Sequence, residues 1–210
     1  MIDYSMLSAA NARSEPFSYA VLPDLVPPGQ AAVLAGEFPV EGFHLDERSA
    51  GDGGKAYRSY NLNIVVENER VSSSWEHLSP VWRQLLSVLA GREYLAALSS
   101  AMAVQVDDCA LEIRLCRYEQ GCWIEPHTDR LDKRLTQTIY FTPGWQSSWG
   151  GNLVILRSAD IGDTAATVSP GLGNSVILVP SEASWHAVQP VSGGAHAHRR
   201  SVLIHLSSRR

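Results

Sequence analysis

From residue 106 onward the sequence is a series of short apolar runs, and this pattern limits the fold more than any other feature. The runs are separated by clusters rich in Gly, Pro, Ser and Asp, such as PGWQSSWGG and SPGLGN. They occupy residues 111–118, 135–142, 151–156, 165–169, 174–180, 185–191 and 200–206. Short strands with turns at this spacing are typical of an antiparallel sandwich or barrel. No long helical pattern interrupts them, which disfavours a parallel α/β sheet.

Upstream of residue 106 the sequence is mixed and predicts helices. Segment 27–38 opens with two prolines followed by good helix formers, and 92–102 predicts another short helix. Segment 72–91 opens with serines and spaces its apolar residues three and four apart, which predicts one amphipathic helix ending at Gly91. Because no linker is evident, we expect a single domain over 1–210, with a helical or mixed layer at 1–105 and a β core at 106–210.

Composition and charge exclude several classes of protein. The 210 residues carry a formal net charge of −5 and no long run of Lys and Arg, so we expect no nucleic-acid partner. No apolar stretch is long enough to cross a membrane, so we expect no membrane association. No signal peptide is evident, and the three cysteines form no CxxC pair, which favours a reducing cytoplasm. The sequence leaves the oligomeric state open, with a homodimer as one candidate.

The segment EPHTD (125–129) contains the strongest candidate for a metal site. His127 and Asp129 are two residues apart, so on a strand or at its end both side chains point to the same side. A third ligand must come from elsewhere, and His186, which opens a later apolar strand, is the best candidate. Two histidines and one carboxylate on one face form the triad of non-haem Fe(II) oxygenases, which leaves positions open for substrate and O2.

The competing interpretation is an ordinary polar turn, because a chain with seven histidines contains one H-x-D pair by chance without difficulty. His44, His77, His196 and His198 are expected on the surface or in loops, and the His196 and His198 pair has no carboxylate nearby. The charged segment RLDKR (130–134) is expected to be a solvated loop. Zincin, CxxC, P-loop and dinucleotide-binding signatures are absent.

A candidate anion site lies at the start of the last apolar run. Arg199 and Ser201 are two residues apart, so a guanidinium fork and a hydroxyl can face the same side and hold a carboxylate. Two adjacent arginines at a solvated strand edge are the alternative. If the run is a core strand, alternation requires that one of Arg199 and Arg200 points inward, where it needs an anionic partner.

The motifs follow one another in an informative order. Along the chain stand Tyr118, EPHTD, GGNLVIL, HAVQPV and the R-R-S sequence at 199–201. This series resembles the Fe(II)- and 2-oxoglutarate-dependent dioxygenase superfamily, and within it the prolyl-4-hydroxylase-like branch. EPHTD is similar to the iron-binding H-x-D motif of that branch, HAVQPV to its distal histidine segment, and R-x-S to its anchor for 2-oxoglutarate. The resemblance covers residues 111–206, and residues 1–105 carry no motif of the family.

The resemblance implies a mainly β fold with N-terminal helices, built on a double-stranded β-helix core (a jelly roll, cupin-like). It also implies that the catalytic residues His127, Asp129 and His186 bind Fe(II). Arg199, assisted by Ser201, would bind the far carboxylate of 2-oxoglutarate. The step from His186 to Arg199 is long for this branch, so Arg200 stays an alternative anchor.

Further residues are candidates on the same basis. Tyr118 stands where the family often has a tyrosine that binds the same carboxylate. The strand parity around Thr138 and Tyr140 is ambiguous, so either, both or neither faces the site; Tyr140 is our candidate. Arg114 shares the face of Tyr118 and is a candidate substrate contact. Trp145, in the 142–150 loop, is a candidate substrate contact that would line the entrance to the site, and structural packing is the alternative role.

The implied enzyme is a hydroxylase that inserts oxygen into an unactivated C–H bond, with Fe(II) as cofactor and 2-oxoglutarate and O2 as co-substrates, releasing succinate and CO2. A compact chain without a peptide-binding addition favours a small-molecule substrate, either amino-acid-like or a natural-product intermediate. The alternatives are a peptidyl prolyl hydroxylase and a non-catalytic cupin-like metal- or ligand-binding module. His205 stands where the nucleic-acid demethylase branch has a second arginine, which disfavours that branch, and the presence of Asp129 disfavours halogenation.

Overall fold

The computed structural model describes residues 1–49 and 54–209, and helices make up the smaller part of it. The helices are α1 (Tyr4–Ser8), α2 (Pro28–Gly36), α3 (Ser72–Trp75), α4 (Pro80–Leu89), α5 (Arg92–Met102) and the 3-10 turn η1 (Ser147–Trp149). The strands are β1 (Tyr19–Leu22), β2 (His44–Arg48), β3 (Tyr57–Val66), β4 (Glu69–Arg70), β5 (Cys109–Tyr118), β6 (Trp123–His127), β7 (Lys133–Tyr140), β8 (Leu153–Leu156), β9 (Thr164–Val168), β10 (Ser175–Leu178), β11 (His186–Val188) and β12 (Arg199–Ser208).

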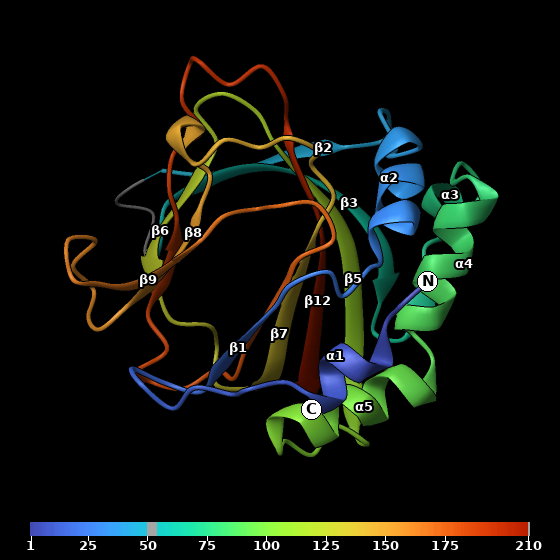
Figure 1. Ribbon diagram of the computed structural model, residues 1–210, viewed down its shortest axis with the longest axis horizontal. Helices are drawn as coiled ribbons and strands as arrows, with labels where there is room; N and C mark the ends of the chain where they lie inside the picture. The colour runs from blue at the N-terminus through green and yellow to red at the C-terminus, as the bar shows by residue number, and fades with distance from the viewer. Residues whose placement is uncertain (50–53, 210) are drawn as a thin grey trace.

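The strands form one curled antiparallel sheet that is nearly closed as a barrel (Figure 1). Their order is β1-β10-β7-β12-β5-β3-β6-β11-β8-β9, with β2 and β4 paired to β3. β3 is the joint of the barrel, because it pairs with β5 along most of its length and with β6 at Tyr57 and Arg58. The architecture is the mainly β, jelly-roll fold expected from the sequence, and each of the seven predicted apolar runs contains a strand.

The α-helices gather on one side of the barrel, beside β3, β5 and β12, while β6, β8 and β9 lie on the opposite side (Figure 1). α4 shows why they pack there. Pro80 starts the helix, and its buried residues Trp82, Leu85, Leu86 and Leu89 follow the helical spacing. The Trp82 indole is fully buried and donates to the Leu34 carbonyl of α2 at 3.0 Å. This layer buries the outward side chains of β3, β5, β7 and β12.

The N-terminal part differs from its prediction in two ways. The single helix expected over 72–91 is wrong, because α3 ends at Trp75 and a new helix starts at Pro80. A proline cannot continue a helix from the preceding turn, since it lacks an N–H and clashes with the carbonyl four residues back. The part before residue 106 also supplies strands β1 to β4 to the sheet. That the chain is one domain stays a prediction, although a single sheet takes strands from both of its halves.

Candidate active site

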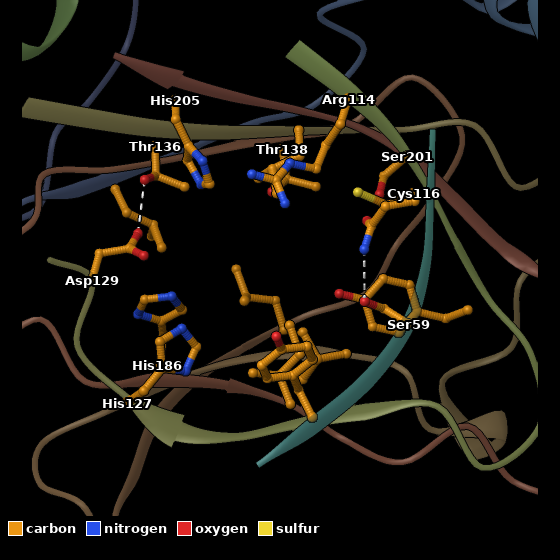
Figure 2. Close-up of a pocket in the computed structure, with 18 of the residues that line it drawn as sticks. Ser59, Arg114, Cys116, His127, Asp129, Thr136, Thr138, His186, Ser201 and His205 are labelled. Carbon is orange, nitrogen blue, oxygen red and sulfur yellow. Dashed lines mark hydrogen bonds between the residues drawn. The ribbon is translucent and has the colours of Figure 1, made fainter. Parts of the chain in front are cut away.

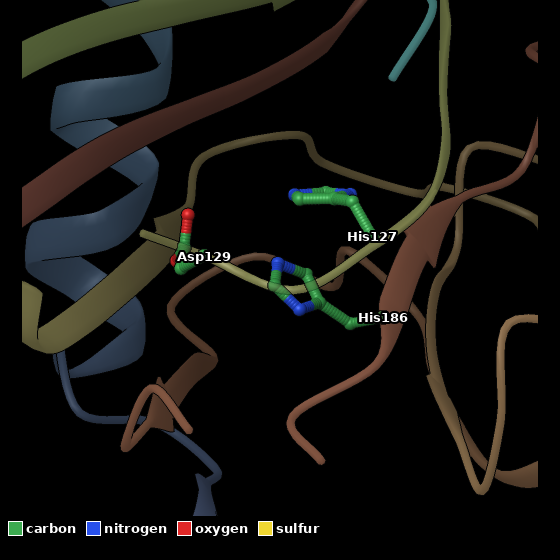
Figure 3. Close-up of side chains that lie close together, drawn as sticks. All are labelled: His127, Asp129 and His186. Atoms are coloured by element: carbon green, nitrogen blue, oxygen red, sulfur yellow. The ribbon is translucent and has the colours of Figure 1, made fainter. Parts of the chain in front are cut away.

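Three buried side chains meet where the ends of two neighbouring strands adjoin. His127 is the last residue of β6, His186 is the first of β11, and the two are direct partners in the antiparallel ladder. Their ring centroids are 4.2 Å apart, and Asp129 follows β6 by two residues. Ligand atoms of the three residues lie within 4.8 Å of one another, so the group could hold one metal ion (Figure 3).

The backbone fixes the orientation of both imidazoles. Nδ1 of His127 lies 2.8 Å from the Glu125 carbonyl oxygen, and Nδ1 of His186 lies 2.8 Å from the Ser184 carbonyl oxygen. Since a carbonyl only accepts, each Nδ1 carries the proton and each Nε2 keeps its lone pair for a metal. Burial, reinforced by the charge of the neighbouring His186, lowers the pKa of His127 to about 2. Burial likewise lowers the pKa of His186, so both rings are neutral.

Two side chains, those of Thr136 and Lys133, hold the Asp129 carboxylate. Thr136 of β7 donates its hydroxyl to Oδ2 at 2.7 Å, and Lys133 donates its ammonium to Oδ1 at 2.7 Å. Burial alone would raise the pKa of Asp129, but the charge and hydrogen bond of Lys133, together with the neighbouring His186 and His205, outweigh burial and keep the pKa well below its usual range. The expectation that RLDKR is a solvated loop is therefore wrong for Lys133, which also lies 3.1 Å from Nε2 of His205. It holds for the exposed Arg130.

The other end of the site is built around Arg199. The guanidinium carbon of Arg199 lies 4.6 Å from the ring centroid of Tyr118 and 5.0 Å from that of Tyr140. Arg199 is 2% exposed. Arg200 faces the helical layer instead, with Nη1 3.3 Å from the Ala35 carbonyl oxygen. Arg199, rather than Arg200, is thus the arginine that faces the interior. Strand parity around residue 140 is also settled, since Thr138 lines the cavity and Tyr140 faces Arg199.

Polar atoms without partners surround Arg199. Among the residues that the structure describes, Nε of Arg199, Oγ of Ser201 and the hydroxyl of Tyr140 are buried and make no hydrogen bond. Buried polar groups are nearly always hydrogen-bonded, so three orphans at one place indicate a missing ligand. All three groups can donate, and the guanidinium is positively charged, which is the chemistry that a carboxylate requires.

One cavity of about 240 Å³ connects the two ends (Figure 2). Its lining includes the three-residue group on one side and Tyr118, Arg199 and Ser201 on the other. Arg114 reaches into it as expected, with Nη2 3.3 Å from a Glu112 carboxylate oxygen. Trp145 does not line it; its indole donates to the Gly150 carbonyl at 3.0 Å and its ring packs on Trp149. A role for Trp145 in binding substrate stays a prediction.

Four cavity-lining residues near Asp129 were missed by sequence reasoning: Lys55, Thr136, Lys133 and His205. A signal existed for two of them. Thr136 shares the parity of Thr138 on one strand, and Lys133 is four residues after Asp129. No local signal placed Lys55 or His205, because their positions depend on pairing between strands distant in sequence.

The fold is a jelly roll, and the group formed by His127, Asp129 and His186 could hold a metal ion. Residues 113–206 match the sequence profile of the 2OG-Fe(II) oxygenase superfamily, where 2OG is 2-oxoglutarate. The matched segment is less than half of the chain; it identifies residues 113–206 as a 2OG-Fe(II) oxygenase domain and the protein as an oxygenase enzyme. Enzymes of this family use Fe(II), 2OG and O2.

Solved structures agree on the fold. A prolyl-4-hydroxylase from Pseudomonas putida has a TM-score of 0.63 at 15% identity, covering 99% of both chains. A Trichoplax adhaerens prolyl hydroxylase in complex with a hypoxia inducible factor fragment has a TM-score of 0.63 at 11% identity, covering 98% of this chain and 89% of that one. The 2OG-dependent epimerase SnoN from nogalamycin biosynthesis has a TM-score of 0.60 at 15% identity, covering 98% and 84%. No curated protein sequence matches this chain.

In the part of the chain that the structure describes, no helix is long and apolar enough to cross a bilayer.

Proposed function

We propose that the protein is a 2OG-Fe(II) hydroxylase acting on a small molecule, in which His127, Asp129 and His186 hold Fe(II). The observation that carries the proposal is the pairing of this neutral-His, ionised-Asp group with an orphaned carboxylate site across one cavity. Iron bound there, with 2OG and O2, would supply the oxidising chemistry that converts a C–H bond to an alcohol, with succinate and CO2 as co-products.

The protein residues would fix the geometry of the co-substrate. Arg199 would receive the far carboxylate of 2OG through its guanidinium, and the hydroxyls of Ser201 and Tyr140 would donate to the same group. The ring of Tyr118 would hold the guanidinium in place. Thr136 would keep the Asp129 carboxylate in one orientation, and Lys133 would balance its charge.

The size of the cavity supports a small-molecule substrate. The cavity has a volume of about 240 Å³, and 2OG would take part of it. A peptidyl prolyl hydroxylase is the second candidate, because structural neighbours carry that name and one of them binds a peptide fragment. We also propose a cytoplasmic location, which is supported by three free cysteines.

Metal-site variants test the proposal. Under anaerobic conditions Fe(II) and 2OG should give the wild-type protein a weak visible absorption band, and His127→Ala or Asp129→Ala should abolish both the band and substrate-dependent succinate formation. Arg199→Leu should retain Fe(II) binding but weaken 2OG by about 10- to 100-fold, since a charge-assisted contact contributes about 1.5–3 kcal/mol.

The exposed His77 provides the control, because its ring bonds only to the Ser73 carbonyl within its own helical segment. His77→Ala should behave as the wild type. Full activity in Asp129→Ala would refute the metal assignment, and absence of the band in a folded wild-type protein would favour a non-catalytic binding module.

A further inference from the structure

The two lysines of the chain lie in the same place. Of its 17 Lys and Arg residues, two are lysines, Lys55 and Lys133. Both line the cavity, whereas the exposed cations of the described surface are arginines. Lysine is a compact ammonium with three donors and is usually a surface residue. Its confinement to the cavity indicates that the ammonium groups serve the site.

Lys133 is already used, but Lys55 is not. Lys133 is bound to Asp129 at 2.7 Å and contacts His205. Among the described residues, Lys55 has no hydrogen bond or ion pair, although it is partly buried. Burial lowers the pKa of Lys55 to about 8, against the attraction of the Asp129 charge. A partly buried ammonium without an anion is unfavourable unless a ligand supplies one.

The backbone fixes Lys55 beside the candidate metal group. The N–H of the next residue, Ala56, donates to the Glu125 carboxylate at 2.9 Å, and the Glu125 N–H donates to the Ala56 carbonyl at 3.0 Å. The Glu125 carbonyl also accepts from the His127 ring. One residue therefore ties the segment that carries Lys55 to the strand that carries His127.

The charges of the lining leave an excess of positive charge after the co-substrate is counted. Four cationic side chains and two carboxylates line the cavity: Lys55, Arg114, Lys133, Arg199, Asp46 and Asp129. The two positive charges of Fe(II) and the two negative charges of 2OG would cancel each other. Arg114 has one nitrogen on Glu112, and its guanidinium extends into the cavity (Figure 2). Lys55 is thus the lining cation without an ion pair among the described residues, and Arg114, which pairs with Glu112 through one nitrogen, has further donors directed into the cavity.

We propose that the substrate is a small organic acid whose carboxylate is bound by Lys55 and Arg114, leaving Arg199 for 2OG. This inference rests on the proposed function, and it narrows that function to anionic substrates. Lys55 would hold the acid near His127, on the metal side of the cavity. The two ion pairs would select an acid over its neutral carboxamide, because the amide would leave both cations unpaired.

The test uses matched pairs of ligands on the whole protein. Free amino acids, N-acetylamino acids and the carboxamide of each are titrated by calorimetry into the Fe(II)- and 2OG-loaded protein without O2, so that binding is measured apart from turnover. At least one acid should bind ten-fold or more tightly than its carboxamide. Lys55→Met should remove that preference, whereas Arg157→Gln, which removes an exposed cation outside the cavity, should keep it.

The outcomes separate this inference from the proposed function. Equal binding of acids and carboxamides, a preference that survives in Lys55→Met, or no binding of any acid while the Fe(II)–2OG band forms would each overturn the inference alone. The comparison of acid with carboxamide needs only the wild-type protein, so it decides the question even if a variant fails to fold. Failure of the band to form would instead refute the proposed function.

Discussion

The ion pair between Lys133 and Asp129 leads to a prediction about metal and stability together. The two side chains are 13% and 6% exposed, and their atoms are 2.7 Å apart. Lys133→Met removes the cation but leaves the carboxylate buried, with Thr136 as its remaining partner. Breaking one side of a buried ion pair costs about 3–5 kcal/mol, and the Thr136 hydroxyl places this case near the lower end.

The loss depends on whether a metal is bound. In the metal-free protein, about 3 kcal/mol corresponds to a fall in Tm of about 6–12 °C for a chain of this size. A divalent ion would replace the missing positive charge beside Asp129, so the loaded variant should lose only about 1 kcal/mol. Linkage then requires the variant to bind the metal more tightly, by about 30-fold for a difference of about 2 kcal/mol.

Thermal unfolding followed by circular dichroism, with a chelator and with Fe(II) under argon, measures all of these quantities. Arg134→Met is the matched control, because Arg134 is the adjacent residue, is exposed and bonds only to Ser208. It should change Tm little in either state. Equal losses with and without metal in Lys133→Met, or an unchanged Tm in the metal-free variant, would refute the reasoning.

Two further predictions concern the apo protein and a turn. Burial lowers the pKa of His205 from 6.5 to about 4. Between these two pH values the unfolded chain binds a proton at His205 and the folded protein does not. The stability that depends on neutral His205 is therefore complete above pH 6.5 and is lost as the pH falls toward 4. In metal-free protein, His205→Gln should reduce the drop in free energy of unfolding between pH 7 and pH 4.5 by about 2–3 kcal/mol in urea titrations, and equal drops would contradict this. Gly150 has φ +69°, and a Cβ there would lie 2.1 Å from the Pro190 carbonyl oxygen. Gly150→Ala should therefore lower Tm by at least about 2–4 °C, and by more than Gly121→Ala, where φ is +78° but no atom lies within 4 Å.

The parts of the site that the sequence predicted are those encoded by local spacing. His127 and Asp129 are two residues apart and Arg199 and Ser201 are two residues apart, so strand alternation alone placed each pair on one face. His186 could be chosen because it opens an apolar run. The helices at 28–36 and 92–102 were likewise visible as continuous runs of helix formers.

The parts that were missed depend on contacts between distant segments. β3 was not predicted, because its burial follows no regular alternation: it pairs with both β5 and β6. Lys55 acquires its place from that strand. Lys133 and Arg130 belong to one charged run, yet Lys133 is partly buried against Asp129 and His205 while Arg130 is exposed, and the contact with His205 depends on the pairing of β7 with β12.

The register of β12 has a consequence for how this protein can evolve. Arg199, Ser201 and His205 line the cavity, while the alternate residues Val202 and Ile204 belong to the core beneath the helices. An insertion or deletion of one residue within β12 would move the cavity-lining side chains to the core face and the core side chains to the cavity. A single such mutation should therefore abolish both ligand binding and stable folding. The loop before β12 is under no such restriction, since pairing of Arg199 with Tyr118 sets where the arginine lies however many residues precede it. The long interval between His186 and Arg199 is therefore a length variation that natural selection can tolerate.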